Sequence, residues 1–296
     1  MTAHLTRVRS QLVIHAHRRV RGQLEGDYAA VAVGRGMDFH DLREYVPGDE
    51  VKDIDWKASA RSRQLLVRRY VAERKHTVHL CVSTGRSMAA LNDAQITKRE
   101  LAVFVAGVVG QLAVQHGDLV GLSIGDEDDL VSERAAGGLV HLERLLGRVH
   151  DAIAPTGPPA DLESLLRHVV RTVRQRTILL VVADDVTLTP GAETLLRRLA
   201  VQHEVLLLTV GDVDPTDPGV AGRRLVDIDT AAEVPAWARD DAQLRREYAA
   251  LVQAEVEQLR RQLDRLGVVH ERVHDHASAV VAVHRLLERH RHARRR

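Results

Sequence analysis

The sequence predicts an α/β fold, with a mostly parallel sheet covered by helices on both faces and a small β-rich module near the N-terminus. Two observations lead to this prediction. Apolar runs of strand length, such as residues 177–183, alternate with helical stretches, and fully apolar strands are typical of a sheet buried on both faces. Aromatic residues make up 3% of a chain that is 45% hydrophobic, so the core is aliphatic, which suits a sheet between helices.

The N-terminal part divides into two segments. Over residues 1–24, apolar residues recur at roughly helical spacing with Arg and His between them, which predicts an amphipathic helix. Over residues 25–72, short apolar runs are broken by glycine and proline, which predicts strands joined by tight turns. We therefore expect a separate small β-rich module in this segment.

Residues 73–296 alternate between strand-like and helical segments, with connections long enough for parallel strands. Gly267 follows the longest helical segment and is expected to cap it. The tail from 289 to 296 is a run of Arg and His, which we interpret as a frayed helix end. The predicted strands lie at 76–83, 119–124, 177–183, 204–210, 224–228 and 268–273, and the predicted helices at 91–116, 161–174, 190–200, 239–266 and 277–290.

Composition excludes several classes of protein. Lys and Arg number 42 and Asp and Glu 41, so the chain has no overall field that would hold nucleic acid or an anionic membrane. The single Cys81 cannot form an internal disulfide, and no Cys/His set has zinc-ligand spacing. No apolar run approaches the roughly 18 residues of a membrane span, and the first residues do not resemble a signal peptide. We expect a cytoplasmic protein.

Residues 270–274 read His-Glu-Arg-Val-His, the HExxH pattern of zinc proteases. That chemistry needs a helix, whereas this segment follows Gly267 and has the valines of a strand. In a strand the two histidines would lie about 13 Å apart, too far to share a zinc ion. The chain also lacks a phosphate-binding loop, a dinucleotide fingerprint and a serine nucleophile elbow. We therefore expect no catalytic residue and no cofactor.

The most distinctive stretch is residues 36–61, which concentrates Tyr, Trp, carboxylates and arginines. One interpretation is a turn at 47–49, with Arg43 or Arg61 paired to a carboxylate that holds the module onto the main domain. The other is a recognition surface, because Trp, Tyr and Arg dominate binding hot spots. The candidate partner-binding residues are Arg43, Tyr45, Asp49, Asp55, Trp56 and Arg61.

This stretch resembles the bacterial family catalogued as domain of unknown function 58, in which a von Willebrand factor A-like domain follows. The resemblance covers roughly residue 34 to the end and implies a von Willebrand A-like, Rossmann-like sheet, in agreement with the alternation above. Asp38 stands where the family usually has Glu. The matching residues are Gly36, Asp38, Phe39, Arg43, Tyr45, Pro47, Gly48, Asp49, Ile54, Asp55, Trp56, Ala60 and Arg61.

The resemblance to von Willebrand A domains also implies a divalent-ion site, formed by a DxSxS loop, a Thr in a second loop and an Asp in a third. Here Ser83 stands at the first Asp position and Gly85 at the first Ser position, and only Ser87 matches. Ala160 stands where Thr is expected, and Asp184 matches the third loop.

One hydroxyl and one carboxylate are too few ligands for Mg²⁺, so we expect a degenerate site that has lost its metal. Arg86 lies beside the gap and could place its guanidinium where the cation would be. The alternative is that Asp185, Thr84 or Thr156 supplies the missing ligands.

The resemblance implies a partner, because such proteins typically accompany MoxR-type AAA+ ATPases as adaptors or co-chaperones. We expect the strand-end loops, including 83–88 and Asp184-Asp185, to dock the partner together with the 43–61 segment. One alternative is a metal-dependent or small-molecule enzyme that uses Asp184 and Asp185 as paired carboxylates. Another is a scaffold that self-associates through the helix at 239–266.

Overall fold

The computed structural model describes residues 3–15, 22–28, 41–46, 54–62, 64–69, 75–92, 94–185, 188–220, 222–235, 237 and 241–293. The chain divides into two compact units. The small unit is Ala32–Lys75, and the main unit is formed by the remainder, Met1–Val31 and His76–Arg296.

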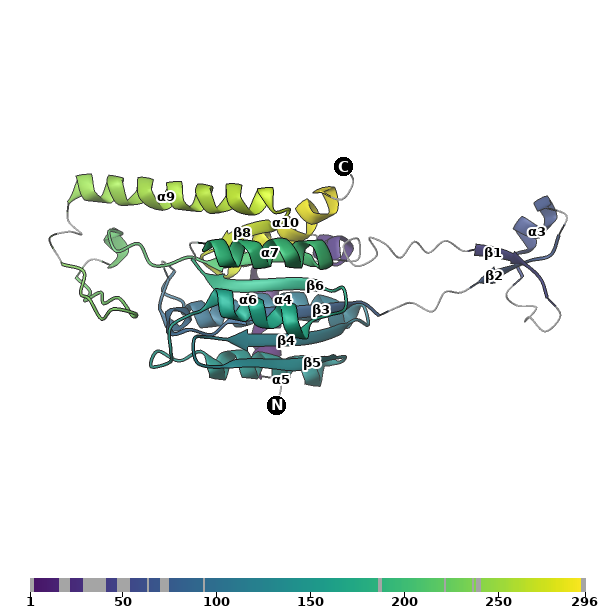
Figure 1. The fold of residues 1–296 in the computed structure, drawn as a ribbon, viewed down its shortest axis with the longest axis horizontal. Coiled ribbons are helices and arrows are strands. Elements are labelled where there is room, and N and C mark those ends of the chain that lie inside the picture. Colours follow the sequence, from purple (N-terminus) through teal and green to yellow (C-terminus); the bar gives the residue numbers. More distant parts are fainter. Residues whose placement is uncertain are drawn as a thin grey trace. The chain divides into compact units, whose positions relative to one another are not determined.

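The main unit is built on one six-stranded sheet in the order β5-β4-β3-β6-β7-β8 (Figure 1). All neighbouring strands are parallel except β4 and β5, which are antiparallel. Strand β3 is the first strand of this sheet along the chain and lies near its centre. The chain then adds β4 and β5 on one side of β3 and returns to place β6, β7 and β8 on the other side. The strands are β3 Thr77–Ser83, β4 Leu119–Gly125, β5 Leu130–Ala136, β6 Ile178–Asp184, β7 Glu204–Val210 and β8 Val269–Val273.

Because the strand order reverses between β3 and β6, the connections leave these two strands in opposite directions. Open α/β sheets bind ligands at such a switch point, outside the carboxyl ends of the strands. Ser83 and Asp184 are the last residues of β3 and β6. The fold therefore places Asp184, the residue that matches the Asp of the third loop, at the switch point.

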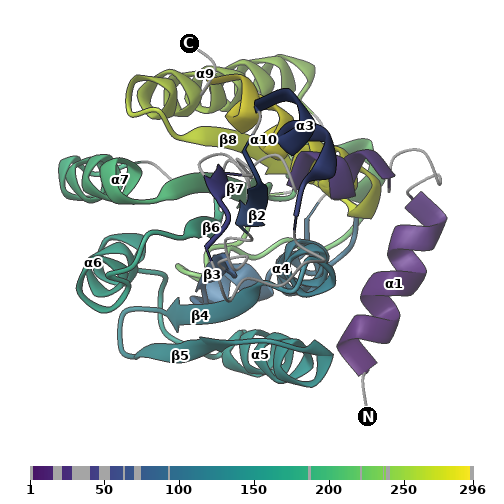
Figure 2. The same ribbon diagram turned by 90° about the vertical axis from the view of Figure 1, so that its right-hand side faces the viewer.

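Helices cover both faces of the sheet (Figure 2). On one face α4 packs against β3, β4 and β6, and is itself covered by α1, α5 and α10. This explains why α4 is buried over most of its length, since a helix that is apolar all round must lie inside. The other face carries α6, α7 and α9. The bounds are α1 Ala3–His15, α4 Lys98–Gln115, α5 Leu139–Ala152, α6 Leu162–Thr172, α7 Pro190–Gln202, α9 Ala242–Arg265 and α10 His276–Ala293, with short 3₁₀ helices η2 Arg86–Ala89 and η3 Pro218–Val220.

The described part of the small unit contains two antiparallel strands, β1 Asp41–Glu44 and β2 Leu66–Arg69, and the helix α3 Trp56–Ser62 between them. The side chain of Asp55 accepts hydrogen bonds from the backbone N–H groups of Lys57 (3.1 Å) and Ala58 (3.0 Å). It therefore caps the N-terminus of α3. Ser59 is buried and accepts a 2.8 Å bond from Leu66 N, which ties the helix to β2.

The predicted α/β class and the mostly parallel sheet are confirmed. Gly267 has φ of +71° directly after α9, as a glycine cap requires. The prediction of a strand at 224–228 is wrong, since Val226 makes only an isolated bridge to Glu233. Of the helix predicted over 1–24, the structure describes α1 over Ala3–His15 and helical residues from 22 to 28, where Leu24 is buried; residues 16–21 lie outside the described residues. Strand β5 and helix α5 were not predicted from the sequence.

Within the residues that the structure describes, no helix is both long enough and apolar enough to cross a lipid bilayer.

Candidate functional site

The loops that follow β3, β4 and helix α5 lie together at the carboxyl edge of the sheet. Arg86 N donates a 2.9 Å hydrogen bond to Pro158 O, and Glu127 N donates one of 3.1 Å to Pro159 O. The resemblance to von Willebrand A domains implies that loop 83–88 and the loop around Ala160 form two parts of one site. The structure brings these two loops into direct contact.

Gly85 lies against the backbone of Ala160. A Cβ atom added at Gly85 would stand 2.3 Å from Ala160 N and 2.4 Å from Ala160 Cα. Real Cβ atoms do not approach backbone this closely, so one loop would have to move. The close approach explains why glycine stands at this position.

We therefore expect Gly85→Ala to lower the free energy of unfolding by about 1–3 kcal/mol, the usual cost of overpacking a tight contact. Urea denaturation of the full chain measures this. Gly147→Ala is the matched control, because Gly147 lies in α5 with nothing within 4 Å of the added Cβ. Equal stability of the two variants would contradict the assignment of Gly85 to a contact that only glycine allows.

At the switch point, the ammonium of Lys98 lies between two carboxylates. Its Nζ is 2.6 Å from Asp184 Oδ1 and 2.5 Å from Asp212 Oδ1. The Lys98 side chain is 1% exposed, that of Asp184 12% and that of Asp212 51%. Lys98 is the first residue of α4, after the cap Thr97, so the helix start delivers this side chain to the end of β6.

The electrostatics of this trio favour a permanently charged lysine. Burial would lower the pKa of Lys98, but the carboxylates of Asp184 and Asp212 outweigh burial and raise it. Partial burial and the negative charge of Asp184 raise the pKa of Asp212, against the opposing effect of Lys98. The lysine thus neutralises the carboxylate at the end of β6 from within the protein. We name Lys98, Asp184 and Asp212 the lysine cluster.

The sequence missed Lys98 and proposed Arg86 for this position. The guanidinium of Arg86 instead pairs with Asp229, with Nε 3.0 Å from Oδ1. Arg86 begins a 3₁₀ helix after β3, whereas Lys98 begins the helix that packs against β6. The tertiary packing of α4 therefore determines that Lys98, and not Arg86, pairs with Asp184.

The residues considered as substitute metal ligands have other partners or lie in solvent. Thr84 Oγ1 donates to Asp126 Oδ2 at 3.2 Å. Asp185 accepts two hydrogen bonds from Arg272 Nε, at 2.8 and 3.1 Å, and pairs also with Nη2. Thr156 is exposed in a turn. The neighbouring carboxylates of Asp184 and Asp185 are therefore each compensated by a separate cation.

The segment with the HExxH pattern is a strand, as predicted. His270 lies in β8 and its Nε2 makes a 3.0 Å hydrogen bond with Thr209 Oγ1 of β7. Glu271 pairs with Arg289 at 3.2 Å. His274 follows the strand. The two histidines thus lack the helical geometry with which such a motif grips zinc.

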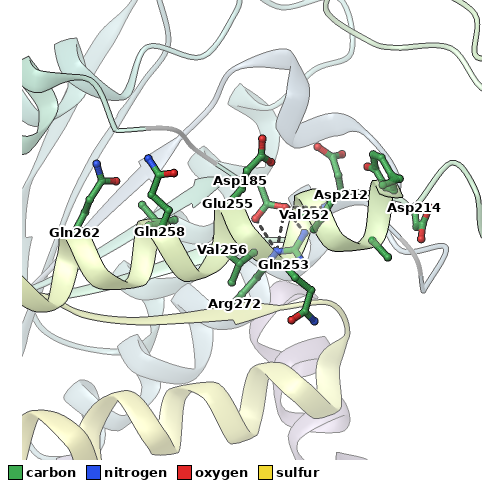
Figure 3. Close-up of a pocket in the computed structure, with 13 residues that line it drawn as sticks. Asp185, Asp212, Asp214, Val252, Gln253, Glu255, Val256, Gln258, Gln262 and Arg272 are labelled. Carbon is green, nitrogen blue, oxygen red and sulfur yellow. Dashed lines mark hydrogen bonds and ion pairs between the residues drawn. The ribbon is translucent and has the colours of Figure 1, made fainter. Parts of the chain in front are cut away.

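A groove of about 490 Å³ runs between α9 and the strand-end loops, next to the lysine cluster (Figure 3). One wall is formed by α9, with Val252, Val256 and Leu259 supplying apolar surface. The other wall carries charge from the strand ends: Asp185, Asp212, Asp214 and Arg272. Gln253, Glu255, Gln258 and Gln262 add polar groups to the α9 wall, so the groove presents a mixed apolar and polar helix face beside a mainly acidic strip.

The candidate binding residues of the small unit gather around β1 and α3. Arg43 lies in β1 opposite Val67, and Tyr45 N donates a 2.8 Å hydrogen bond to Leu65 O. Arg61 lies exposed in α3. Trp56 begins that helix with 62% of its surface exposed, an unusual position for so large an apolar side chain.

Two of the candidates differ from the rest. Asp55 serves a structural purpose, as the cap of α3. Asp49 lies outside the described residues.

Comparison with known proteins identifies relatives. The family described as "Protein of unknown function DUF58" matches residues 41–258. Uncharacterized proteins of Mycobacterium tuberculosis and Mycobacterium bovis are 28% identical over 207 residues, which are 70% of this chain and 64% of theirs. The chain thus spans about two thirds of the length of these curated relatives.

Solved structures with a similar fold include the conserved hypothetical protein BatB from Bacteroides thetaiotaomicron, with a TM-score of 0.46 and 15% identity over 73% of this chain and 98% of that one. An aerotolerance-related membrane protein from Bacteroides fragilis has a TM-score of 0.43 and 14% identity, over 72% and 99%. A von Willebrand factor type A protein from Catenulispora acidiphila has a TM-score of 0.40 and 14% identity, over 78% and 43%.

Proposed function

We propose that this chain, which belongs to the DUF58 family and has a von Willebrand A-like α/β fold, is a non-catalytic protein-interaction module. In this proposal it serves as an adaptor or co-chaperone of a MoxR-type AAA+ ATPase. The observation that carries the proposal is the lysine cluster, in which a buried ammonium compensates the carboxylate at the switch point. A sheet edge neutralised in this way is suited to bind a protein without the help of a bound ion.

The cluster also supports a degenerate metal site. Mg²⁺ prefers several oxygen ligands with an octahedral arrangement. Gly85 and Ala160 supply no side-chain oxygen, and an ion at Asp184 would have to displace the Lys98 ammonium at 2.6 Å. The residues therefore do not fit a hard divalent ion. Saturable Mg²⁺ binding that disappears in Asp184→Ala would contradict this part of the proposal.

Two surfaces are candidates for docking the ATPase. On the main unit, the groove beside α9 combines apolar and acidic surface at the edge where open α/β sheets bind their ligands. On the small unit, Trp56 exposes a large apolar side chain, of the type that dominates binding hot spots. Each surface is proposed independently of the other.

The test is affinity capture from native extract with ATP and Mg²⁺ present, using the tagged full chain and identifying the bound proteins by mass spectrometry. We expect an AAA+ ATPase to be recovered. Trp56→Ala should reduce its recovery by about tenfold, the effect of a hot-spot residue. Val252→Asp should reduce it as well, because Val252 lines the apolar wall of the groove.

Matched controls separate these surfaces from general effects. Trp237 is also exposed but belongs to the main unit, so Trp237→Ala should retain the ATPase. Leu251 is exposed on α9 beside Val252 without lining the groove, so Leu251→Asp should retain it too. Failure of the folded, unchanged protein to capture any AAA+ ATPase would refute the adaptor role.

The two alternative functions have less support. An enzyme with paired carboxylates needs Asp184 and Asp185 to act together, but they pair with Lys98 and Arg272 respectively. A scaffold that self-associates through α9 is compatible with the exposed Leu251. Size-exclusion chromatography with mass detection separates the scaffold from the adaptor, since a monomer excludes the scaffold.

A further inference from the structure

A groove of about 500 Å³ lies between α6 and α7, on the outer face of the main unit, and is lined largely by arginine. It is separate from the lysine cluster and from the groove beside α9. Its lining contains no carboxylate, although the whole chain carries nearly equal numbers of acidic and basic residues. The lining residues are Arg167, Val170, Arg171, Arg174, Leu195, Arg198 and Gln202.

The two helices build this groove from facing rows. Arg167, Arg171 and Arg174 follow one another at spacings of four and three residues along and just past α6, which places them on one side of that helix. Arg198 and Gln202 lie four residues apart on α7, and so on one side of that helix. Gln202 Nε2 donates a 2.5 Å hydrogen bond to Arg174 O and so ties the two rows together at one end.

The charge of the groove is not compensated within the described residues. Arg167 pairs with Glu163 at 2.6 Å, whereas Arg171, Arg174 and Arg198 have no acidic partner in the part of the chain that the structure describes. Elsewhere on α7, Arg197 has its partner Glu193 at the usual spacing of four residues. Like charges at this spacing destabilise a helix, so the uncompensated arginines carry a cost that a function would explain.

The titration of a neighbouring histidine is consistent with a positive field. Partial burial and the charge of Arg171 both lower the pKa of His168, on the same helix. Apolar side chains, Val170 and Leu195, lie between the arginines. The groove thus offers an apolar strip flanked by cations, over a length of about 16 Å for the 11 residues of α6.

From this arrangement we propose that the α6–α7 groove binds an acidic, amphipathic segment of a partner protein. The carboxylates of that segment pair with Arg171, Arg174 and Arg198, in the charge-assisted geometry that guanidinium groups favour. Its apolar residues lie on Val170 and Leu195. The groove is short and has no aromatic side chain among its lining residues, which distinguishes it from the stacking platforms that bind single-stranded nucleic acid.

The test measures binding of a fluorescein-labelled helical peptide to the full chain by fluorescence anisotropy. The peptide carries leucines at i, i+4 and i+7 and glutamates at i+1, i+3, i+8 and i+10, which flank the leucines on one face of the helix, and a second peptide replaces each glutamate with glutamine. We expect saturable binding of the acidic peptide, weakening as NaCl is raised, and little binding of the glutamine peptide. Arg171→Gln/Arg198→Gln should weaken binding about tenfold, or about threefold for each solvent-exposed ion pair.

A variant with the same loss of charge provides the control. Arg134 on β5 and Arg285 on α10 are exposed and lie outside the groove, so Arg134→Gln/Arg285→Gln should bind the acidic peptide normally. Equal weakening by both double variants would refute the groove as the site, and so would equal binding of the two peptides. A single-stranded oligonucleotide of equal charge that binds more tightly than the acidic peptide, and depends on Arg171 and Arg198, would also refute the proposed partner.

Discussion

Lys98→Met is expected to lower the free energy of unfolding by about 3 kcal/mol, because it leaves the buried Asp184 carboxylate without its cation. Methionine has a similar length and shape, so little of this loss comes from a cavity. Asp212 is half exposed and can regain water, which places the estimate at the lower end of the range for broken buried pairs. Urea denaturation at neutral pH measures the change.

A double-mutant cycle tests whether the loss comes from the ion pair. Asp184→Asn removes the charge that Lys98 compensates, so the double variant should be more stable than the sum of the two single losses implies. Lys57→Met is the control, since Lys57 is exposed in the small unit and its loss should change stability by less than about 0.5 kcal/mol. Additive losses would mean that Lys98 and Asp184 are not coupled.

The fold could be predicted from the sequence where apolar patterns were strong. Strands β6 and β7 are buried along their whole length, and their continuous apolar runs identified them. Strand β5 was missed because it is an edge strand whose alternate residues face solvent, among them Arg134. The predicted strand at 224–228 has the right local composition, but among the described residues its pairing is limited to the bridge between Val226 and Glu233.

The candidate site could be predicted only in part. The loops after β3 and β6 were identified because Ser87 and Asp184, which match the ion-site positions of von Willebrand A domains, follow strongly apolar strands. Lys98 could not be identified, since it is separated from Asp184 by 86 residues and nothing near it in the sequence suggests burial. Asp212 was missed for the same reason. The grooves depend on how α9 lies against the strand ends and α6 against α7, which is decided by tertiary packing rather than by local pattern.

The protein is expected to lose stability steeply as the pH falls from about 6.5 to 4, because two buried histidines must take up protons. Burial lowers the pKa of both His79 and His270 from the ordinary 6.5 to about 4. The positive charges of His203 and His168 act in the same direction on His79. Both rings are fixed by hydrogen bonds, His79 Nε2 to Ser123 Oγ at 2.8 Å and His270 Nε2 to Thr209 Oγ1 at 3.0 Å.

The sign follows from proton linkage. Between pH 6.5 and 4 the unfolded chain binds protons at these positions and the folded chain does not, so the free energy of unfolding falls as the pH falls. A shift from 6.5 to about 4 corresponds to about 3 kcal/mol for each histidine. Carboxylates whose pKa is lowered in the fold, such as Asp275, lose their contribution only as the pH falls below their ordinary value of 3.8. The two effects therefore occupy different pH windows.

Urea denaturation across this range, on the unchanged chain and on His79→Gln, separates the contribution of one histidine. The variant should be less stable at pH 7.5, since glutamine fills the space beside Gly121 poorly, but its loss of stability between pH 6.5 and 4 should be smaller by the contribution of one histidine, about 3 kcal/mol. His150→Gln removes a histidine of α5 from the surface and should keep the full pH dependence. An unchanged pH dependence in His79→Gln would contradict the prediction. It would mean that protonation of His79 does not contribute to the loss of stability at low pH, and that other titratable groups cause it.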